Sequence, residues 1–151
     1  MRIAVGADHA GFDLKAAVLE ELRARGVEVV DCGTHDRRPC DYPDYAAKVA
    51  GMVAAGGASR GVLICGTGQG MCMAANRFPG VRAALVYDEF AAQISRQHND
   101  ANVICLGGRL ISGPEAKRLL GLWLETPFAG DRHARRVGKL DSVGPCARKG
   151  D

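Results

Sequence analysis

One segment of the chain combines a thiol with a cluster of glycines: residues 65–70 read CGTGQG. Glycine accepts left-handed backbone conformations and has no side chain to block a ligand, so successive N–H groups can converge on an anion. Cys65 stands at the rim of this predicted anion nest, where amide dipoles would favour its thiolate. Such a thiolate can act as a nucleophile or a general base. The candidate anion-binding residues are Gly66, Gly68 and Gly70.

Three familiar ligand-binding loops do not match this segment. A Walker A loop needs a lysine that residues 65–70 lack, and the dinucleotide pattern G-x-G-x-x-G breaks at Met71. The Cys-x5-Arg phosphatase loop breaks at the same position. Two other interpretations stay open: the segment is a tight turn that only packs, and Cys65 is a buried thiol at a strand end. Cys72 falls within the helix that follows and is expected to pack.

Basic side chains gather late in the chain, where Arg132, His133, Arg135 and Arg136 fall within five residues. Arg132 and Arg136 are four residues apart, so on a helix they share one face. Two guanidinium groups on one face can bind a phosphate through paired hydrogen bonds. The alternative is a solvated basic face with no ligand.

Two histidines follow or precede predicted strands. His9 comes after Asp8 at the end of the first strand, and His98 with Asn99 precedes the last strand. Both are expected near the ligand-binding edge of the sheet, although a single histidine often has only a structural role. No histidine–carboxylate pair has a spacing typical of metal ligands, so we predict neither a metal nor another cofactor.

Short apolar runs alternate with stretches of helical spacing along the chain. Gly26 is placed to end the first helix, Ser112 and Glu115 fit a capping box that opens a later one, and a last helix is expected near Arg132. Strands are predicted at residues 2–6, 27–30, 61–65, 82–86 and 102–106.

This alternation predicts a three-layer α/β/α Rossmann-like domain with a five-stranded parallel sheet. We expect a single domain over residues 1–151 with a frayed tail after about residue 142. In such folds ligands bind beyond the carboxyl ends of the strands. Residues 65–70 follow the third predicted strand and therefore belong to that edge.

Composition excludes several classes of protein. The 151 residues are 47% hydrophobic and 25% charged, which excludes disorder, collagen and coiled coil. The net charge of +3 and the 5% of aromatic residues give no reason to expect a nucleic-acid or membrane partner. The six cysteines include no C-x-x-C pair and no secretory signal precedes them, so we expect reduced thiols in a cytoplasmic protein.

Taken together, the motifs resemble the ribose-5-phosphate isomerase B family, which includes allose-6-phosphate and galactose-6-phosphate isomerases. The resemblance spans about residues 1–140, and its motifs are specific as an ordered set. They are GADHAGF at 6–12, DYP at 41–43, CGTGQG at 65–70, AANR at 74–77, SRQHNDAN at 95–102, and RH at 132–133 with Arg136.

The resemblance implies an isomerase that interconverts ribose 5-phosphate and ribulose 5-phosphate through an enediolate. Cys65 matches the family's base; members without it carry a glutamate where this chain has Met71. Thr67 and His98 match the residues that open the sugar ring. By the same resemblance, Asn99 joins the nest glycines in holding the enediolate, and substrate binding falls to Asp8, His9, Tyr42, Arg109, Arg132 and Arg136.

The resemblance also implies a homodimer whose active sites are built from two subunits. It does not identify the sugar substrate, because a 6-phosphohexose isomerase carries the same motifs. A non-catalytic phosphosugar-binding module is the alternative from a different class, and the presence of a base together with ring-opening residues argues against it.

Overall fold

The structure is a computed structural model that describes residues 1–143. The predicted fraying of the tail concerns mainly residues 144–151, which lie outside the described residues. Within residues 1–143, no helix is long and apolar enough to cross a membrane.

All five predicted strands are present, and each boundary lies within one residue of its predicted place. The first, third and fifth strands are almost entirely buried, whereas the other two are partly exposed, as expected for the edges of a sheet. The strands are β1 (Arg2–Ala7), β2 (Glu28–Asp31), β3 (Arg60–Cys65), β4 (Ala83–Leu85) and β5 (Val103–Gly107).

Helices separate the strands, and local sequence explains several of their ends. The predicted capping box is confirmed: Ser112 Oγ accepts a hydrogen bond from Glu115 N, and the Glu115 carboxylate accepts one from Ser112 N at 2.8 Å. The helices are α1 (Phe12–Ala24), α2 (Tyr42–Ala54), α3 (Gln69–Ala75), α4 (Glu89–Gln97), α5 (Gly113–Glu125) and α6 (Asp131–Ser142).

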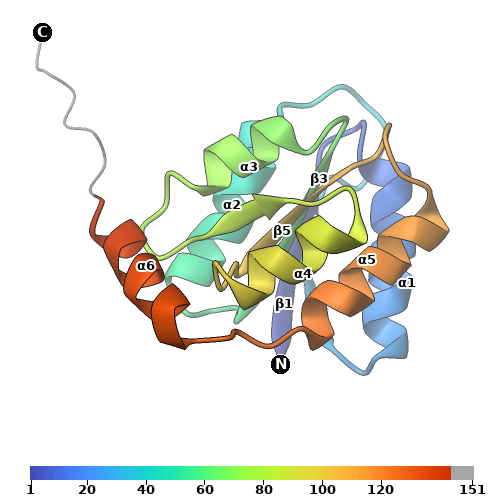
Figure 1. Cartoon of the computed structure of the whole chain (residues 1–151). Coiled ribbons are helices and arrows are strands. Elements are labelled where there is room, and N and C mark those ends of the chain that lie inside the picture. The colour runs from blue at the N-terminus through green and yellow to red at the C-terminus, as the bar shows by residue number, and fades with distance from the viewer. Residues whose placement is uncertain (144–151) are drawn as a thin grey trace, which may run out of the picture.

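The sheet has the strand order β2-β1-β3-β5-β4, and all four strand pairs are parallel. The predicted α/β fold with a five-stranded parallel sheet is therefore confirmed. Figure 1 shows helices on both sides of the sheet, with α6 set apart from the other helices.

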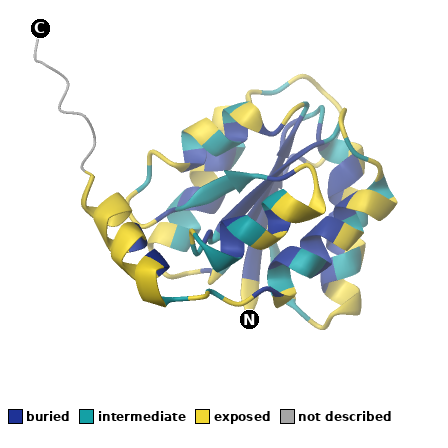
Figure 2. Ribbon diagram, viewed as in Figure 1, coloured by how far each residue is buried: buried dark blue, intermediate teal, exposed yellow. Residues whose placement is uncertain are grey.

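Two apolar cores lie on the two faces of the sheet, and Figure 2 shows the central strands as the most buried part of the chain. One core joins the sheet to α1, α4 and α5; its large buried side chains include Ile3, Val18, Ile104, Leu119 and Trp123. The other joins the sheet to α2 and α3, and includes Val49, Leu63, Cys65, Met71 and Cys105.

The strand order creates a reversal beside β1. The chain passes from β1 to β2 on one side and then crosses to β3 on the other side. The loops that leave β1 and β3 therefore diverge, and a crevice opens between their carboxyl ends, where ligands bind in folds of this kind. Residues 65–70 follow β3 directly and so border this crevice.

A buried lysine fixes the loop that follows β2. Lys15, on α1, is 3% exposed, and its Nζ donates to both carboxylate oxygens of Asp31 at 2.7 and 2.9 Å and to Thr34 O at 2.6 Å. The same loop is joined to the end of β1, since Ala7 N donates to Gly33 O and Thr34 N donates to Ala7 O, both at 2.7 Å. Lys15 thereby holds the crevice wall next to β1.

Replacing this lysine should destabilise the protein. Lys15→Met removes the buried partner of a half-buried ion pair and leaves Asp31 and Thr34 O without this donor, so we expect the free energy of unfolding to fall by about 3 kcal/mol in urea denaturation. Burial of Asp31 acts to raise its pKa, but hydrogen bonds from Lys15 and Gly33 more than offset this effect and leave the pKa below its ordinary value of 3.8. The contribution of Asp31 is therefore complete above that value, and it is lost as the pH falls through the lower folded-state pKa.

Lys117→Met provides the matched control. Lys117 pairs with Glu20 at 2.7 Å, but the side chain of Glu20 is 72% exposed. Its loss should cost less than about 1 kcal/mol. Equal costs for the two substitutions would contradict the role given to Lys15.

Candidate active site

The turn between β3 and α3 directs a backbone amide at a thiol. Gly68 N donates to Cys65 Sγ at 3.1 Å, and Gly68 has φ +79°. A Cβ on Gly68 would lie 2.6 Å from Leu85 Cδ1 and 3.1 Å from the carbonyl carbon of Leu106. Both the backbone conformation and the lack of space therefore require glycine here.

Cys65 is held by β5 as well as by its own turn. Its carbonyl accepts a hydrogen bond from Gly108 N at 2.8 Å, and the residue is 5% exposed. The sulfur is thus shielded from bulk water, and the amide of Gly68 that it faces can stabilise negative charge. The binding of an anion by residues 66–70 stays a prediction.

Two side chains flank the nest. Arg109 N donates to Gly66 O at 3.0 Å, and its guanidinium lies so close that a Cβ on Gly66 would be 3.4 Å from Nη1. On the other side the ring of Tyr42 lies against Gly70, where a Cβ would be 2.7 Å from the ring. Arg109 and Tyr42 are both exposed, so they line the nest without closing it.

The loop after β1 brings a carboxylate and an imidazole to the same edge. Asp8 is 6% exposed, and its Oδ1 accepts hydrogen bonds from Ala10 N and Gly11 N at 2.9 and 3.0 Å. Asp8 N donates to Ile64 O at 3.1 Å, which places the loop beside the end of β3. His9 Nδ1 lies 3.2 Å from both the N and the O atoms of Cys40.

These side chains form what we call the carboxyl-edge cluster. It comprises a shielded thiol, two hydroxyls, a carboxylate and two cationic or titratable groups around backbone amides, which suits proton transfer on an anionic substrate. Its members are Asp8, His9, Tyr42, Cys65, Thr67 and Arg109. Within residues 1–143, no group of three or more His, Cys, Asp or Glu residues could hold a metal ion.

The expectation that His98 and Asn99 lie at the same edge is wrong within one chain. α4 leaves the carboxyl end of β4 and runs back along the sheet, so its C-terminus at His98 lies at the amino edge, shortly before β5 begins at Val103. A residue that precedes a strand of a parallel sheet is necessarily at that strand's amino end. The motif was located correctly in the sequence but assigned to the opposite edge.

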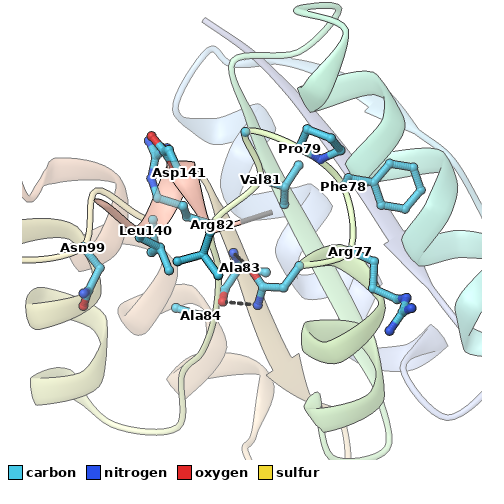
Figure 3. A pocket seen from close by; sticks show the side chains of 14 residues that line it. Arg77, Phe78, Pro79, Val81, Arg82, Ala83, Ala84, Asn99, Leu140 and Asp141 are labelled. Carbon is cyan, nitrogen blue, oxygen red and sulfur yellow. Dashed lines mark hydrogen bonds and ion pairs between the residues drawn. The ribbon is translucent and has the colours of Figure 1, made fainter. Parts of the chain in front are cut away.

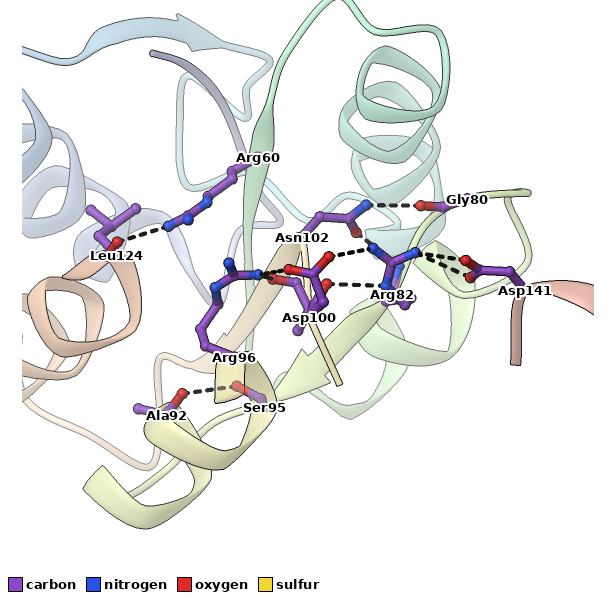
Figure 4. Close-up of polar contacts among 11 residues, drawn as sticks. Arg60, Gly80, Arg82, Ala92, Ser95, Arg96, Asp100, Asn102, Leu124 and Asp141 are labelled. Carbon is purple, nitrogen blue, oxygen red and sulfur yellow. Dashed lines mark hydrogen bonds and ion pairs between the residues drawn. The ribbon is translucent and has the colours of Figure 1, made fainter. Parts of the chain in front are cut away.

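A polar network fixes this amino edge. Asn102 Oδ1 accepts from Arg82 N at 2.8 Å, and the Arg82 guanidinium contacts Asp100 at 3.0 Å and Asp141 at 3.1 Å. Asp100 also accepts from Arg96 Nη1 at 2.8 Å. Figure 4 shows how Arg82 joins the loop before β5 to Asp141 of α6.

α6 carries its arginines to the same place. The rings of His98 and His133 stack with centroids 4.0 Å apart and planes 9° apart. His133 is 7% exposed, whereas Arg132 and Arg136 are exposed beside it. We call His98, Asn99, Arg132, His133 and Arg136 the amino-edge cluster.

Sequence reasoning gave His133 no role of its own. Burial lowers its pKa, and the nearby His98, Arg132 and Arg136 lower it further. The same positive charges that lower the pKa of this imidazole would stabilise an anion bound beside it. The sequence held one signal that His133 is buried. His133 and Val137 are four residues apart, so they share one face of α6, and both are buried there.

A cavity of about 690 Å³ lies at the amino edge, between α6 and the segment that joins α3 to β4. Asn99, Arg82, Leu140 and Asp141 are among its lining residues, as Figure 3 shows. Cys65 does not line it. The proposed chemical groups of one chain therefore occupy two separate regions of its surface.

Comparison with known proteins decides the family. The family model for Ribose/Galactose Isomerase matches residues 3–140. The chain belongs to this family. Ribose-5-phosphate isomerase B of Escherichia coli is 45% identical over 142 residues, which cover 94% of this chain and 95% of the relative.

Solved structures of relatives share the fold of this Ribose/Galactose Isomerase family member. The structure of Clostridium thermocellum ribose-5-phosphate isomerase B has a TM-score of 0.93 at 45% identity, covering 95% of this chain and 97% of that one. The Mycoplasma genitalium enzyme, solved with bound ribulose-5-phosphate, has a TM-score of 0.89 at 42% identity and covers 93% of both chains.

The need for glycine at position 68 can be measured. Gly68→Ala puts a Cβ on a left-handed residue and against Leu85, so we expect the free energy of unfolding to fall by at least about 1–2 kcal/mol. The matched control is Gly138→Ala, because Gly138 lies within α6 and a Cβ there meets nothing within 4 Å. That change should stabilise the protein by about 0.5–1 kcal/mol. Similar stability of the two variants in urea denaturation would contradict the proposed constraint.

Proposed function

We propose that this chain interconverts ribose 5-phosphate and ribulose 5-phosphate, as the names of its relatives indicate. The observation that carries the proposal is the shielded thiol of Cys65, hydrogen-bonded by Gly68 N at 3.1 Å on the rim of an amide nest. A proton next to a carbonyl group is removed only if the negative charge that develops on the carbonyl oxygen is stabilised. The nest supplies donors for that charge beside a group that can take the proton.

In the proposed mechanism Cys65 acts as a thiolate base. It takes the proton from C2 of the open-chain aldose, which leaves an enediolate whose oxygens are held by the amides of residues 66–70 and by Asn99. The thiol then returns the proton to C1, and a proton moves between the two oxygens, so the product is the ketose and Cys65 is again a thiolate. No redox cofactor or metal is needed for this balance.

The other residues bind and prepare the sugar. Thr67 and His98 transfer protons in opening the furanose ring, while Asp8 and Tyr42 bind sugar hydroxyl groups. The phosphate is held by cationic side chains from both regions of the surface, which are His9, Arg132 and Arg136. Arg109 also binds the substrate, beside the nest.

We further propose a homodimer with shared active sites. The carboxyl-edge cluster holds the base and the amino-edge cluster holds His98 and the two arginines of α6, and these lie at opposite edges of one sheet. In a two-fold dimer, contact of the carboxyl-edge cluster of each copy with the amino-edge cluster of the other makes two equivalent sites. Tyr87, Phe90 and Leu110, at 58–72% exposure, leave apolar surface that a second copy would bury.

A 6-phosphohexose isomerase is the second candidate, since the matching family is described by both ribose and galactose. Side-by-side turnover of ribose 5-phosphate, allose 6-phosphate and galactose 6-phosphate separates the candidates. Binding of all three without turnover would leave a phosphosugar-binding module instead. A single domain over residues 1–151 and a cytoplasmic location stay predictions.

Removing the proposed base should slow turnover strongly but spare binding. We expect Cys65→Ala to lower kcat by about 10²–10⁴-fold, the contribution typical of a positioned base. Affinity for a phosphorylated sugar acid should change little, because the phosphate ligands remain. Cys32→Ala is the matched control, since that thiol follows β2, is not a member of the carboxyl-edge cluster and donates to Val30 O at 3.8 Å. Near-normal turnover of Cys65→Ala would refute the assignment.

Mixing two inactive variants tests the shared site. In a heterodimer of Cys65→Ala with His98→Ala, one site has lost both residues and the other keeps both. Random exchange should therefore restore about a quarter of the wild-type specific activity. Cys65→Ala mixed with Asp8→Ala is the control, because both positions belong to the carboxyl-edge cluster and no intact site can form. Failure of the first mixture, with exchange verified by mass spectrometry, would exclude sharing.

A further inference from the structure

Lys15 is a buried charge that the proposed mechanism does not use. It lies on α1, is 3% exposed, and is not a member of the carboxyl-edge cluster. A charge is costly to bury unless its hydrogen bonds are satisfied. The Lys15 ammonium meets this condition through Asp31 and Thr34, which lie where β2 ends and its loop begins. Its contacts therefore lead toward the site, although Lys15 does not line the site itself.

Lys15 is connected to Asp8 through both its backbone and its side chain. Its backbone N–H donates to Gly11 O at 2.9 Å, and Gly11 N donates to the Asp8 carboxylate at 3.0 Å. Its side chain donates to Thr34 O at 2.6 Å, and Thr34 N donates at 2.7 Å to the carbonyl of Ala7, the residue before Asp8. These contacts form a closed ring, so the turn that begins at Asp8 is held both to α1 and to the loop after β2.

The loop after β2 also holds the imidazole of His9. The Nδ1 atom of His9 lies 3.2 Å from both the N and the O atoms of Cys40, which is near the end of this loop. The start of the loop is fixed by Lys15 together with Asp31, whose carboxylate also accepts from Gly33 N at 2.9 Å. Because Nδ1 is directed at Cys40, the other ring nitrogen, Nε2, is the one that can meet a ligand. The loop therefore sets the direction in which His9 can bind an anion.

We propose that Lys15 is a positioning residue for substrate binding, because it fixes the loop after β2 and thereby the turn that carries Asp8 and His9. The inference rests on the proposed function, in which Asp8 binds a sugar hydroxyl group and His9 binds the phosphate. Lys15 itself is too buried to touch the substrate. A displacement of about 1 Å at a binding group can cost about 10²-fold. The loss of a contact outside the site should therefore be measurable in substrate binding.

The arrangement of these contacts predicts which kinetic constant changes. Cys65, the proposed base, is held by other groups, since Gly68 N donates to its sulfur and Gly108 N donates to its carbonyl. Loss of the Lys15 side chain should therefore weaken substrate binding and leave the proton-transfer step nearly intact. A role of Lys15 in stability alone would change neither constant in the folded protein.

Kinetics of the folded variants test the proposal. At a temperature at which circular dichroism shows each protein fully folded, Lys15→Met should raise KM for ribose 5-phosphate about tenfold and change kcat less than about threefold. Leu119→Ala is the matched control, because Leu119 is 1% exposed on α5 and its truncation should destabilise the fold without reaching the loop after β2. Both constants should stay within about twofold of the wild-type values in this control. An unchanged KM in Lys15→Met would overturn the proposal, and so would an equal rise in Leu119→Ala.

A binding measurement makes the test independent of turnover. In the Cys65→Ala background, calorimetry should show that Lys15→Met raises the Kd for ribose 5-phosphate about tenfold. Adding His9→Ala should reduce this effect of Lys15→Met to about threefold or less, because one of the positioned groups is then absent. An effect that stays tenfold without His9 would overturn the proposal. If the wild-type protein binds ribose 5-phosphate without converting it, the proposed function fails, while the Kd values still decide the role of Lys15.

Discussion

The site depends on backbones that approach one another more closely than any side chain would allow. Where β1, β3 and β5 end, Gly11, Gly68 and Gly108 each lie so near a neighbouring backbone or side chain that a Cβ would lie 2.5–2.6 Å from it. This contact lets Gly68 N reach Cys65 Sγ, and it lets Gly108 N reach the Cys65 carbonyl. Glycine is abundant in this chain partly because three loops must share a narrow edge.

Local sequence predicted most of the elements, because their determinants are local. Apolar runs defined the strands to within one residue, and Ser112 with Glu115 defined the start of α5. Strand order could not be read from the same signals. β5 lies between β3 and β4. This position depends on how the apolar faces of distant elements pack together, which local sequence does not specify.

The structure shows where the predicted site residues lie, and only some of them lie at the predicted edge of the sheet. The nest, Asp8 and Arg109 lie at the expected edge because each follows a strand directly. His98 does not, since the direction of α4 carries it to the other edge. His133 was missed because its importance depends on the ring that it stacks against, and that ring is 35 residues away in the sequence.

The pairing of Cys65 with Gly107 has a consequence for the order in which the protein is made. The ribosome releases β3 and its glycine turn more than 30 residues before β5 emerges. Until then the cysteine lacks the strand that holds its carbonyl, and the turn lacks the wall formed by Leu106. The nascent chain therefore carries a complete CGTGQG sequence before it has a complete site. The site can form only later, when β5, which is distant in sequence, pairs with β3 at the centre of the sheet.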